Sequence, residues 1–237
     1  MAGHTDGTSR QLIHIPLIHA PADMGTMAQR LEAVYVDRFG RRRWQEQVAL
    51  AERFWRAVRR ELESLGLDYA RVDMYQDGLP VCGKEAQIVR AAAGQGSENH
   101  QLLVDLMARG ASLVGTEDTR LLLEEYQDLQ AAVGRALPAE KASPGGRETP
   151  PAAQRRGFED EQDEGRAATA RHLVRLAERD AYIGRRIGTT LQPGRTGLLL
   201  LGMAHAIEPH LPGDIVVSRL HFSELLSTGT CEREKET

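Results

Sequence analysis

The sequence has 237 residues, 41% of them hydrophobic, which is enough for one core of ordinary size. Thirty basic and thirty-four acidic side chains give a formal net charge of -4, which argues against a surface that grips a nucleic-acid backbone. The two cysteines, Cys82 and Cys231, lie far apart, so the sequence indicates neither a disulfide framework nor a zinc site built from thiolates. We therefore expect a protein of a reducing compartment that has no nucleic-acid partner.

The sequence also lacks the features of a membrane protein. Its first ten residues, MAGHTDGTSR, contain no apolar signal core, and the longest apolar run, 197–204, is far shorter than a membrane-spanning helix. We expect a cytoplasmic protein with no membrane partner.

Apolar spacing predicts alternating strands and helices along the chain. A short run rich in branched residues predicts a buried strand over 12–20, which Pro21 ends. Residues 44–66 place apolar side chains every three or four positions before Gly66, as an amphipathic helix does. Further on, the patterns predict strands at 70–80, 111–118, 197–205 and 214–220 and helices at 98–110, 122–137 and 171–191.

This alternation predicts an α/β fold, in which a mostly parallel sheet is layered with helices. We expect a single domain over residues 11–226, with flexible tails at 1–10 and 227–237. Residues 138–165 are rich in proline, glycine and charge and have little to bury, so they predict a disordered insert within the domain.

Titratable residues follow several of the predicted strands. In a parallel sheet the carboxyl ends of the strands meet at one edge, where ligands bind. Histidine transfers protons near neutral pH or ligates a metal, and a neighbouring carboxylate orients it. Each residue also has a structural explanation. Asp77 can stabilise a turn, and Asp118 can cap a helix. A single histidine at a strand end more often makes a structural hydrogen bond than takes part in catalysis. The residues expected at this edge are His19, Asp23, Asp77, Glu117, Asp118 and His205.

Two short motifs give the chain a family resemblance. Arg179-Asp180 opens a stretch that leads into a strand ending in Gly202-Met203-Ala204-His205. This arrangement resembles the closing part of the superfamily that includes the TraB, Tiki, ChaN and erythromycin-esterase-like proteins. The same superfamily has a second Gly-x-x-His near the N-terminus, where PLIHAPADMG offers His19, and a glutamate between the two motifs. Here Pro16 replaces the first glycine, so the N-terminal motif is degraded.

The resemblance implies hydrolysis of an ester or peptide-type bond, in some members with a divalent metal. We expect His19 or His205 to activate a water and Glu117 to orient it or share the proton. Arg179 is expected to stabilise developing negative charge or bind a substrate carboxylate, with an ordinary ion pair to Asp180 or Glu117 as the alternative. Asp23, Asp77 and Asp118 are expected to bind a small-molecule or peptide substrate.

Alternatives to this hydrolytic site stay open. In a metal-dependent variant, manganese, cobalt or zinc is held by His19, Glu117 and His205. A non-catalytic module that binds a small ligand or regulates through the same cleft, and a scaffold that binds partners through the charged insert, are the other hypotheses. The sequence leaves open whether the chain forms a homo-oligomer.

Overall fold

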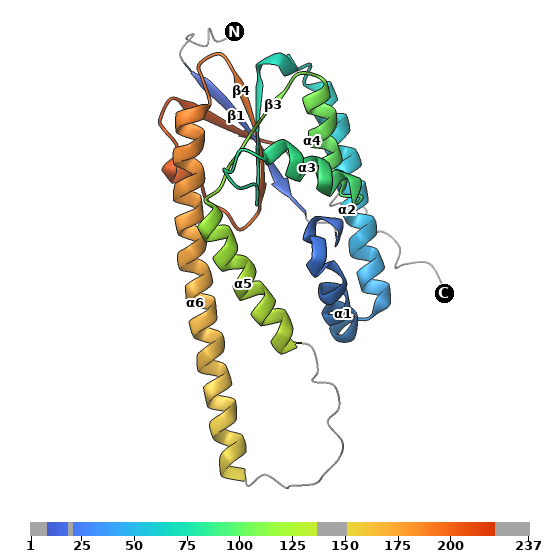
Figure 1. Ribbon diagram of the computed structural model, residues 1–237, viewed down its shortest axis with the longest axis vertical. Helices are drawn as coiled ribbons and strands as arrows, with labels where there is room; N and C mark the ends of the chain where they lie inside the picture. The colour runs from blue at the N-terminus through green and yellow to red at the C-terminus, as the bar shows by residue number, and fades with distance from the viewer. Residues whose placement is uncertain (1–8, 19–20, 137–150, 221–237) are drawn as a thin grey trace, which may run out of the picture.

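The computed structural model describes residues 9–18, 21–136 and 151–220 and confirms the predicted α/β fold. Five strands form one sheet in the order β3-β2-β4-β1-β5, and every neighbouring pair is parallel (Figure 1). The strands are β1 (Arg10–Leu17), β2 (Val72–Gln76), β3 (Ser112–Val114), β4 (Thr196–Gly202) and β5 (Ile215–Arg219). All five carboxyl ends therefore lie at the same edge of the sheet.

The late strand β4 lies at the centre of the sheet. It pairs with β1 from Gln11↔Thr196 to Leu17↔Gly202 and with β2 from Val72↔Thr196 to Gln76↔Leu200. Its apolar run is buried on both faces, as expected for a central parallel strand. This position brings the end of β4 beside the ends of both β1 and β2.

Helices cover both faces of the sheet and give it three layers. One face packs against α2 (Arg41–Ser64), α3 (Glu85–Gly94) and α4 (Glu98–Ala108), and the other against α6 (Pro151–Thr190), which runs beside α5 (Thr119–Ala136) (Figure 1). Because side chains alternate along a strand, Leu198 and Leu200 enter the first core and Leu199 and Leu201 the second. In α2 the buried residues are Ala51, Phe54, Trp55, Val58 and Leu62, which confirms the central part of the predicted helical stripe, whereas Leu65 at its end is 40% exposed.

Strand β2 is fully buried despite its few apolar residues. Its acidic residue, Asp73, accepts hydrogen bonds of 2.7 Å from both Nε and Nη2 of Arg195, and the Tyr75 hydroxyl lies 2.9 Å from the Thr190 hydroxyl. These hydrogen-bond partners offset the cost of burying the polar groups of the strand. The sequence pattern shows few apolar residues here and does not reveal these partners.

Helices α1 (Ala28–Phe39) and α3 were not predicted. Helix α1 follows the short helix η1 (Pro21–Met27) and has no buried residue, although Leu31, Tyr35 and Phe39 recur at helical spacing. The Tyr35 ring contacts both Phe39 of the same helix and Trp44 at the start of α2, with ring centroids 4.8 Å and 5.5 Å apart.

Part of the expected insert lies outside the described residues, namely 138–150. Helix α6 begins at Pro151, so its 40 residues take in the remaining part of that insert. The predicted tails fall almost wholly on residues 1–8 and 221–237, which are likewise not described. Among the described helices, none combines the length and apolarity needed to span a bilayer.

Candidate active site

The carboxyl edge of the sheet gathers most of the predicted site residues. Asp77 follows β2, Glu117 follows β3 and His205 follows β4, while Arg179 and Asp180 reach them from α6. A parallel bridge between Pro80 and Glu117 ties the loops after β2 and β3 together. His19 lies outside the described residues, so its place in the site stays a prediction.

Arg179 joins three carboxylates. Its Nε lies 2.5 Å from Glu117 Oε2, and its Nη2 lies 2.7 Å from both Glu117 Oε1 and Asp77 Oδ1. Its Nη1 donates to Glu125 of α5. These bonds use four of the five N–H groups of the guanidinium, so one donor remains for any further acceptor.

The charges of this cluster perturb one another in a buried setting. Burial opposes ionisation of Asp77, yet the Arg179 charge and then His205 hold the pKa of this carboxyl below its usual range. Burial raises the pKa of Glu117, whose side chain is 1% exposed, although Arg179 acts in the opposite direction. Burial alone would lower the pKa of Arg179, but its bond to Glu117 and the three carboxylate charges raise it. Arg179 therefore stays charged.

His205 is oriented by Asp180. The ring Nδ1 lies 2.5 Å from Asp180 Oδ1, and the other Asp180 oxygen accepts a 2.8 Å hydrogen bond from the backbone N–H of Ala206. With the carboxylate accepting from Nδ1–H, the neutral ring presents an unprotonated Nε2. That nitrogen lies 3.8 Å from Asp77 Oδ2, which also accepts from the Gly202 N–H at 3.0 Å.

Two glycines of α6 bring the loop after β4 against the helix. A Cβ built on Gly184 would lie 2.5 Å from Cβ of His210, and one on Gly188 would lie 2.8 Å from Cγ of Pro212. Asp180, Gly184 and Gly188 are spaced four residues apart and so lie along one face of the helix. The close approach of this loop places His205 where Asp180 can reach it.

We expect Gly184→Ala to destabilise the fold by about 1–3 kcal/mol, because the added methyl overlaps both side-chain and backbone atoms of His210. Gly134→Ala is the matched control, since nothing lies within 4 Å of a Cβ at that position of α5. There the change should stabilise by about 0.5–1 kcal/mol through helix propensity. Urea unfolding of both variants tests this, and equal effects would mean that the loop is not held by Gly184.

The other predicted substrate-binding residues lie apart from the Arg179 cluster. The carboxylate of Asp23, in η1, accepts from the Ser97 hydroxyl, and that hydroxyl lies 2.6 Å from Nδ1 of His100. Asp118 caps α5, because its Oδ1 accepts from the N–H groups of Arg120 at 2.9 Å and Leu121 at 3.1 Å. No described contact joins either residue to His205.

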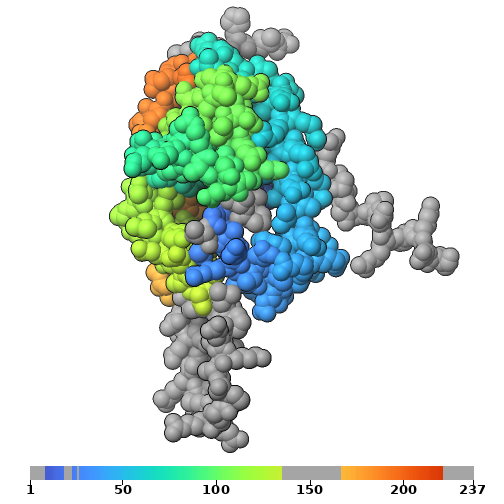
Figure 2. Space-filling model, turned by 45° about the vertical axis from the view of Figure 1, so that its right-hand side comes forward, coloured from blue at the N-terminus to red at the C-terminus, as the bar shows by residue number. Residues whose placement is uncertain are grey.

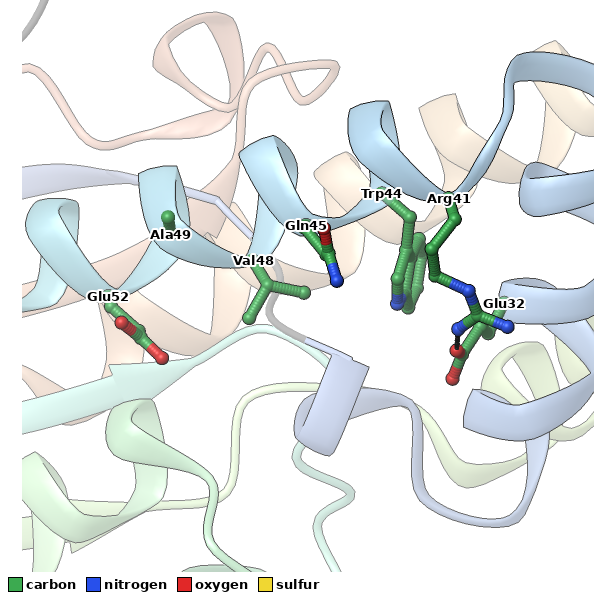
Figure 3. Close-up of a pocket in the computed structure, with 7 residues that line it drawn as sticks. All are labelled: Glu32, Arg41, Trp44, Gln45, Val48, Ala49 and Glu52. Atoms are coloured by element: carbon green, nitrogen blue, oxygen red, sulfur yellow. Dashed lines mark hydrogen bonds and ion pairs between the residues drawn. The ribbon is translucent and has the colours of Figure 1, made fainter.

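Hollows in the surface lie around this edge. Figure 2 shows one between α3 and α4, α5, and the η1–α1 segment, which are the elements that follow the strand ends. A cavity of about 310 Å³ lies between α5 and α6 and is lined in part by Asp118, Glu178 and Tyr182. Another, of about 360 Å³, lies between α1 and α2, where Trp44, Val48 and Glu52 point to the same side of α2 (Figure 3).

The expected metal ligands fit the geometry only in part. Both oxygens of Glu117 already accept from Arg179, and Oε1 also accepts from the Gly78 N–H at 2.6 Å, so this carboxylate is engaged. Within the described residues, no group of three or more His, Cys, Asp and Glu side chains is spaced to hold a metal ion. Nε2 of His205 and Oδ2 of Asp77 are the ligand atoms that face each other.

His14, on β1, is a buried histidine that lies close enough to His205 for the two side chains to interact electrostatically. Burial lowers its pKa from the ordinary 6.5. The folded protein therefore resists protonation of His14 more than the unfolded chain does, and stability falls as the pH drops below about 6.5.

We expect the wild type to lose about 1 kcal/mol more stability than His14→Leu between roughly pH 7.5 and 5.5. Urea unfolding at the two pH values measures the difference. His172→Gln, a change at an exposed position of α6, serves as the control. A wild type whose pH dependence matches that of His14→Leu would contradict the burial argument.

Comparison with protein family models, with curated proteins and with solved structures finds no match. The geometry of the residues is therefore the basis for a functional proposal.

Proposed function

We propose that the protein is a hydrolase that cleaves an ester or peptide-type bond with His205 as its general base. The observation that carries this proposal is the Asp180–His205 pair, whose free Nε2 faces Asp77 across 3.8 Å. A carboxylate on Nδ1 fixes the tautomer and stabilises the imidazolium that forms when Nε2 takes a proton. The resemblance to the superfamily of TraB and erythromycin-esterase-like proteins points to the same reaction class.

In this mechanism Nε2 of His205 removes a proton from a water, and the water oxygen bonds to the substrate carbonyl carbon. The bond from that carbon to the leaving oxygen or nitrogen then breaks, and the imidazolium returns its proton to the leaving group. Asp77 faces the reacting nitrogen and orients the water.

Arg179 forms the ion pair with Glu117 that was the alternative to a direct role in catalysis. Since four of its N–H groups already bind carboxylates, it has a single donor left for an oxyanion. We propose that its main task is to hold Asp77 in place opposite His205, and that Glu117 fixes Arg179 through the two-bond contact.

A metal-dependent form of the reaction is also compatible with the residues. Asp77 and His205 would then be the ligands, with Asp77 in place of Glu117 for the reason given above, and His19 as a third. A divalent ion there would supply a polarised water at neutral pH. Whichever form holds, Asp180 keeps its role of orienting the His205 ring.

A screen of esters, lactones and peptides, run with a chelator and again with manganese, cobalt or zinc, tests the proposal. We expect His205→Asn to abolish turnover of any substrate found, because asparagine can neither exchange a proton near neutral pH nor replace imidazole as a ligand. Since the His205 side chain is buried, the change should also cost about 1–3 kcal/mol of stability.

Activity is therefore compared per folded molecule, with circular dichroism and urea unfolding as controls. Full activity in the folded fraction of His205→Asn would contradict the proposal.

A further inference from the structure

His14 is a buried polar residue whose ring the fold leaves unpaired. The residue is 4% exposed, and neither Nδ1 nor Nε2 has a hydrogen-bond partner in the part of the chain that the structure describes. A buried polar group without a partner destabilises the folded state. Its neighbours on β1, Leu12, Ile13 and Ile15, are apolar core residues, so an apolar side chain would suit this strand better. The imidazole therefore calls for an explanation other than stability.

His14 lies on the same face of the sheet as His205. Side chains alternate along β1, so His14 points to the face covered by α6, where Leu12 belongs to the core. Asp180 of α6 holds the His205 ring on this face, and the His205 backbone N–H bonds back to the Gly202 carbonyl at 3.2 Å. The turn after β4 thus folds toward the neighbouring strand β1, and the two imidazoles are close enough to interact electrostatically.

The charged groups around His14 are already paired with each other. Glu208, in the short helix η3 (Glu208–His210), accepts a hydrogen bond from Arg219 at the end of β5, and both interact with His14 electrostatically. Burial, the largest effect, lowers the pKa of His14, so the ring is neutral at neutral pH. A neutral imidazole offers one N–H donor and one bare nitrogen acceptor. It suits an uncharged polar group, because a charged group would lose its hydration there without a free counter-ion.

We propose that His14 is a further substrate-binding residue, which forms a hydrogen bond with an uncharged group of the substrate, such as a peptide or ester carbonyl, while the bond to be cleaved lies at His205. The inference rests on the proposed function and adds a contact on the α6 side of the sheet. It also gives a reason for a histidine within an apolar strand, since binding sites often retain groups that lower stability.

Stability provides the first test. The urea midpoint of His14→Leu at near-neutral pH is expected to equal or exceed that of the wild type, because leucine removes two unpaired polar atoms and fills a similar volume. His172→Gln, at an exposed position of α6, is the control and should leave the midpoint unchanged. A midpoint well below that of the wild type would show that the imidazole supports the fold, and this would overturn the inference.

Turnover of the best substrate from the screen provides the second test. Per folded molecule, kcat/KM should fall at least about tenfold in His14→Leu and change less than about twofold in His172→Gln. His14→Asn places its amide near the position of Nδ1, and His14→Gln places its amide near that of Nε2, so one of them should recover part of the loss. Wild-type rates in His14→Leu, or recovery in neither amide variant, would overturn the inference.

A binding measurement needs no turnover. N-methylacetamide, which contains a single uncharged peptide group, and acetate are titrated into the full-length protein labelled with 15N-histidine, and the ring nitrogens are followed by NMR. We expect N-methylacetamide to shift the His14 and His205 signals together and acetate to shift them less. In His14→Leu the affinity for N-methylacetamide should fall at least about fivefold. No shift of His14, an equal response to acetate, or unchanged affinity in His14→Leu would overturn the inference.

The two measurements separate this inference from the proposed function. If esters or peptides are cleaved equally well by the wild type and His14→Leu, the hydrolase proposal stands and the role of His14 fails. If N-methylacetamide binding depends on His14 but no ester or peptide is cleaved, the binding role stands and the hydrolytic function is overturned.

Discussion

Arg179→Met is expected to lower the free energy of unfolding by about 3–5 kcal/mol, because it leaves a group of buried carboxylates without their common counter-ion. Glu117 is buried and the side chain of Asp77 is only 10% exposed, and the guanidinium contacts both as well as Glu125. Methionine fills a similar volume, so the loss measures mainly the charge and its hydrogen bonds. Urea unfolding at neutral pH gives the magnitude.

The pH dependence of this variant provides a second readout. Without Arg179, burial and mutual repulsion raise the pKa of the carboxylates in the folded state above their values in the unfolded chain. The folded form then binds protons more readily, so the deficit should shrink as the pH falls from 7 towards about 5. A deficit that stays constant over this range would contradict the electrostatic explanation.

Arg175→Met is the control for Arg179→Met. Arg175 lies one turn earlier on α6 and pairs with Asp128 and Glu124, which are far more exposed than Glu117. Exposed ion pairs contribute little, so a loss of no more than about 1 kcal/mol is expected. Comparable losses in the two variants would mean that the position on α6, not the cluster, sets the cost.

Asp180→Asn is expected to reduce turnover by about 10³–10⁴-fold, the largest effect on activity from any change that leaves His205 in place. The amide keeps the shape of the carboxylate but can present an N–H to Nδ1, which favours the tautomer with Nε2 protonated. That tautomer cannot accept a proton from water at Nε2. Rates are measured on the best substrate from the screen and corrected for folded fraction.

The pH–rate profile distinguishes this role from a structural one. A merely structural Asp180 would leave the profile unchanged in the folded fraction, whereas an orienting carboxylate shifts the limb that reports His205. Asp214→Asn is the control, since Asp214 pairs with Arg10 at the amino-terminal edge of the sheet and should leave the rate unchanged. Unaltered kinetics in Asp180→Asn would remove Asp180 from the mechanism.

The sequence predicted the fold well because buried elements carry strong periodic signals. Helix α2 shows its stripe of apolar residues, and β4 shows a continuous apolar run bounded by glycines. Helix α1 carries only a short apolar stripe, in which none of the residues is buried and Tyr35 contacts Trp44 of α2. Pattern analysis detects burial in a core, and it misses helices held at the surface.

From the sequence, we could predict which residues lie at the carboxyl edge of the sheet, but not which of them contact one another. Rules for parallel sheets placed Asp77, Glu117 and His205 at one edge, and the motif added Arg179. Asp77 was nevertheless expected to serve a turn or the substrate, because nothing local shows that its carboxylate meets Arg179 a hundred residues later. Glu125 resembled an ordinary charge on the solvent face of a helix, and only the packing of α5 beside α6 reveals its contact.

The pairing of Asp180 with His205 depends on the orientation of α6. Neighbouring residues on a helix point about 100° apart, so Arg179 and Asp180 reach two different partners from adjacent positions. The motif named both residues but did not indicate that the aspartate pairs with His205. That partner is fixed by the close contact of Gly184 and Gly188 with the loop after β4, a feature that no spacing rule predicts.

The central place of β4 makes the order of the strands in the chain differ from their order in the sheet. When β1, β2 and β3 have been made, the strand that joins β1 to β2 in the folded sheet, β4, is still missing. Asp77 and Glu117 already exist at that stage, but His205 and the inner strand do not. The joining of the two halves of the sheet and the completion of the His205 environment therefore both depend on β4, whose pairings with β1 and β2 are non-local.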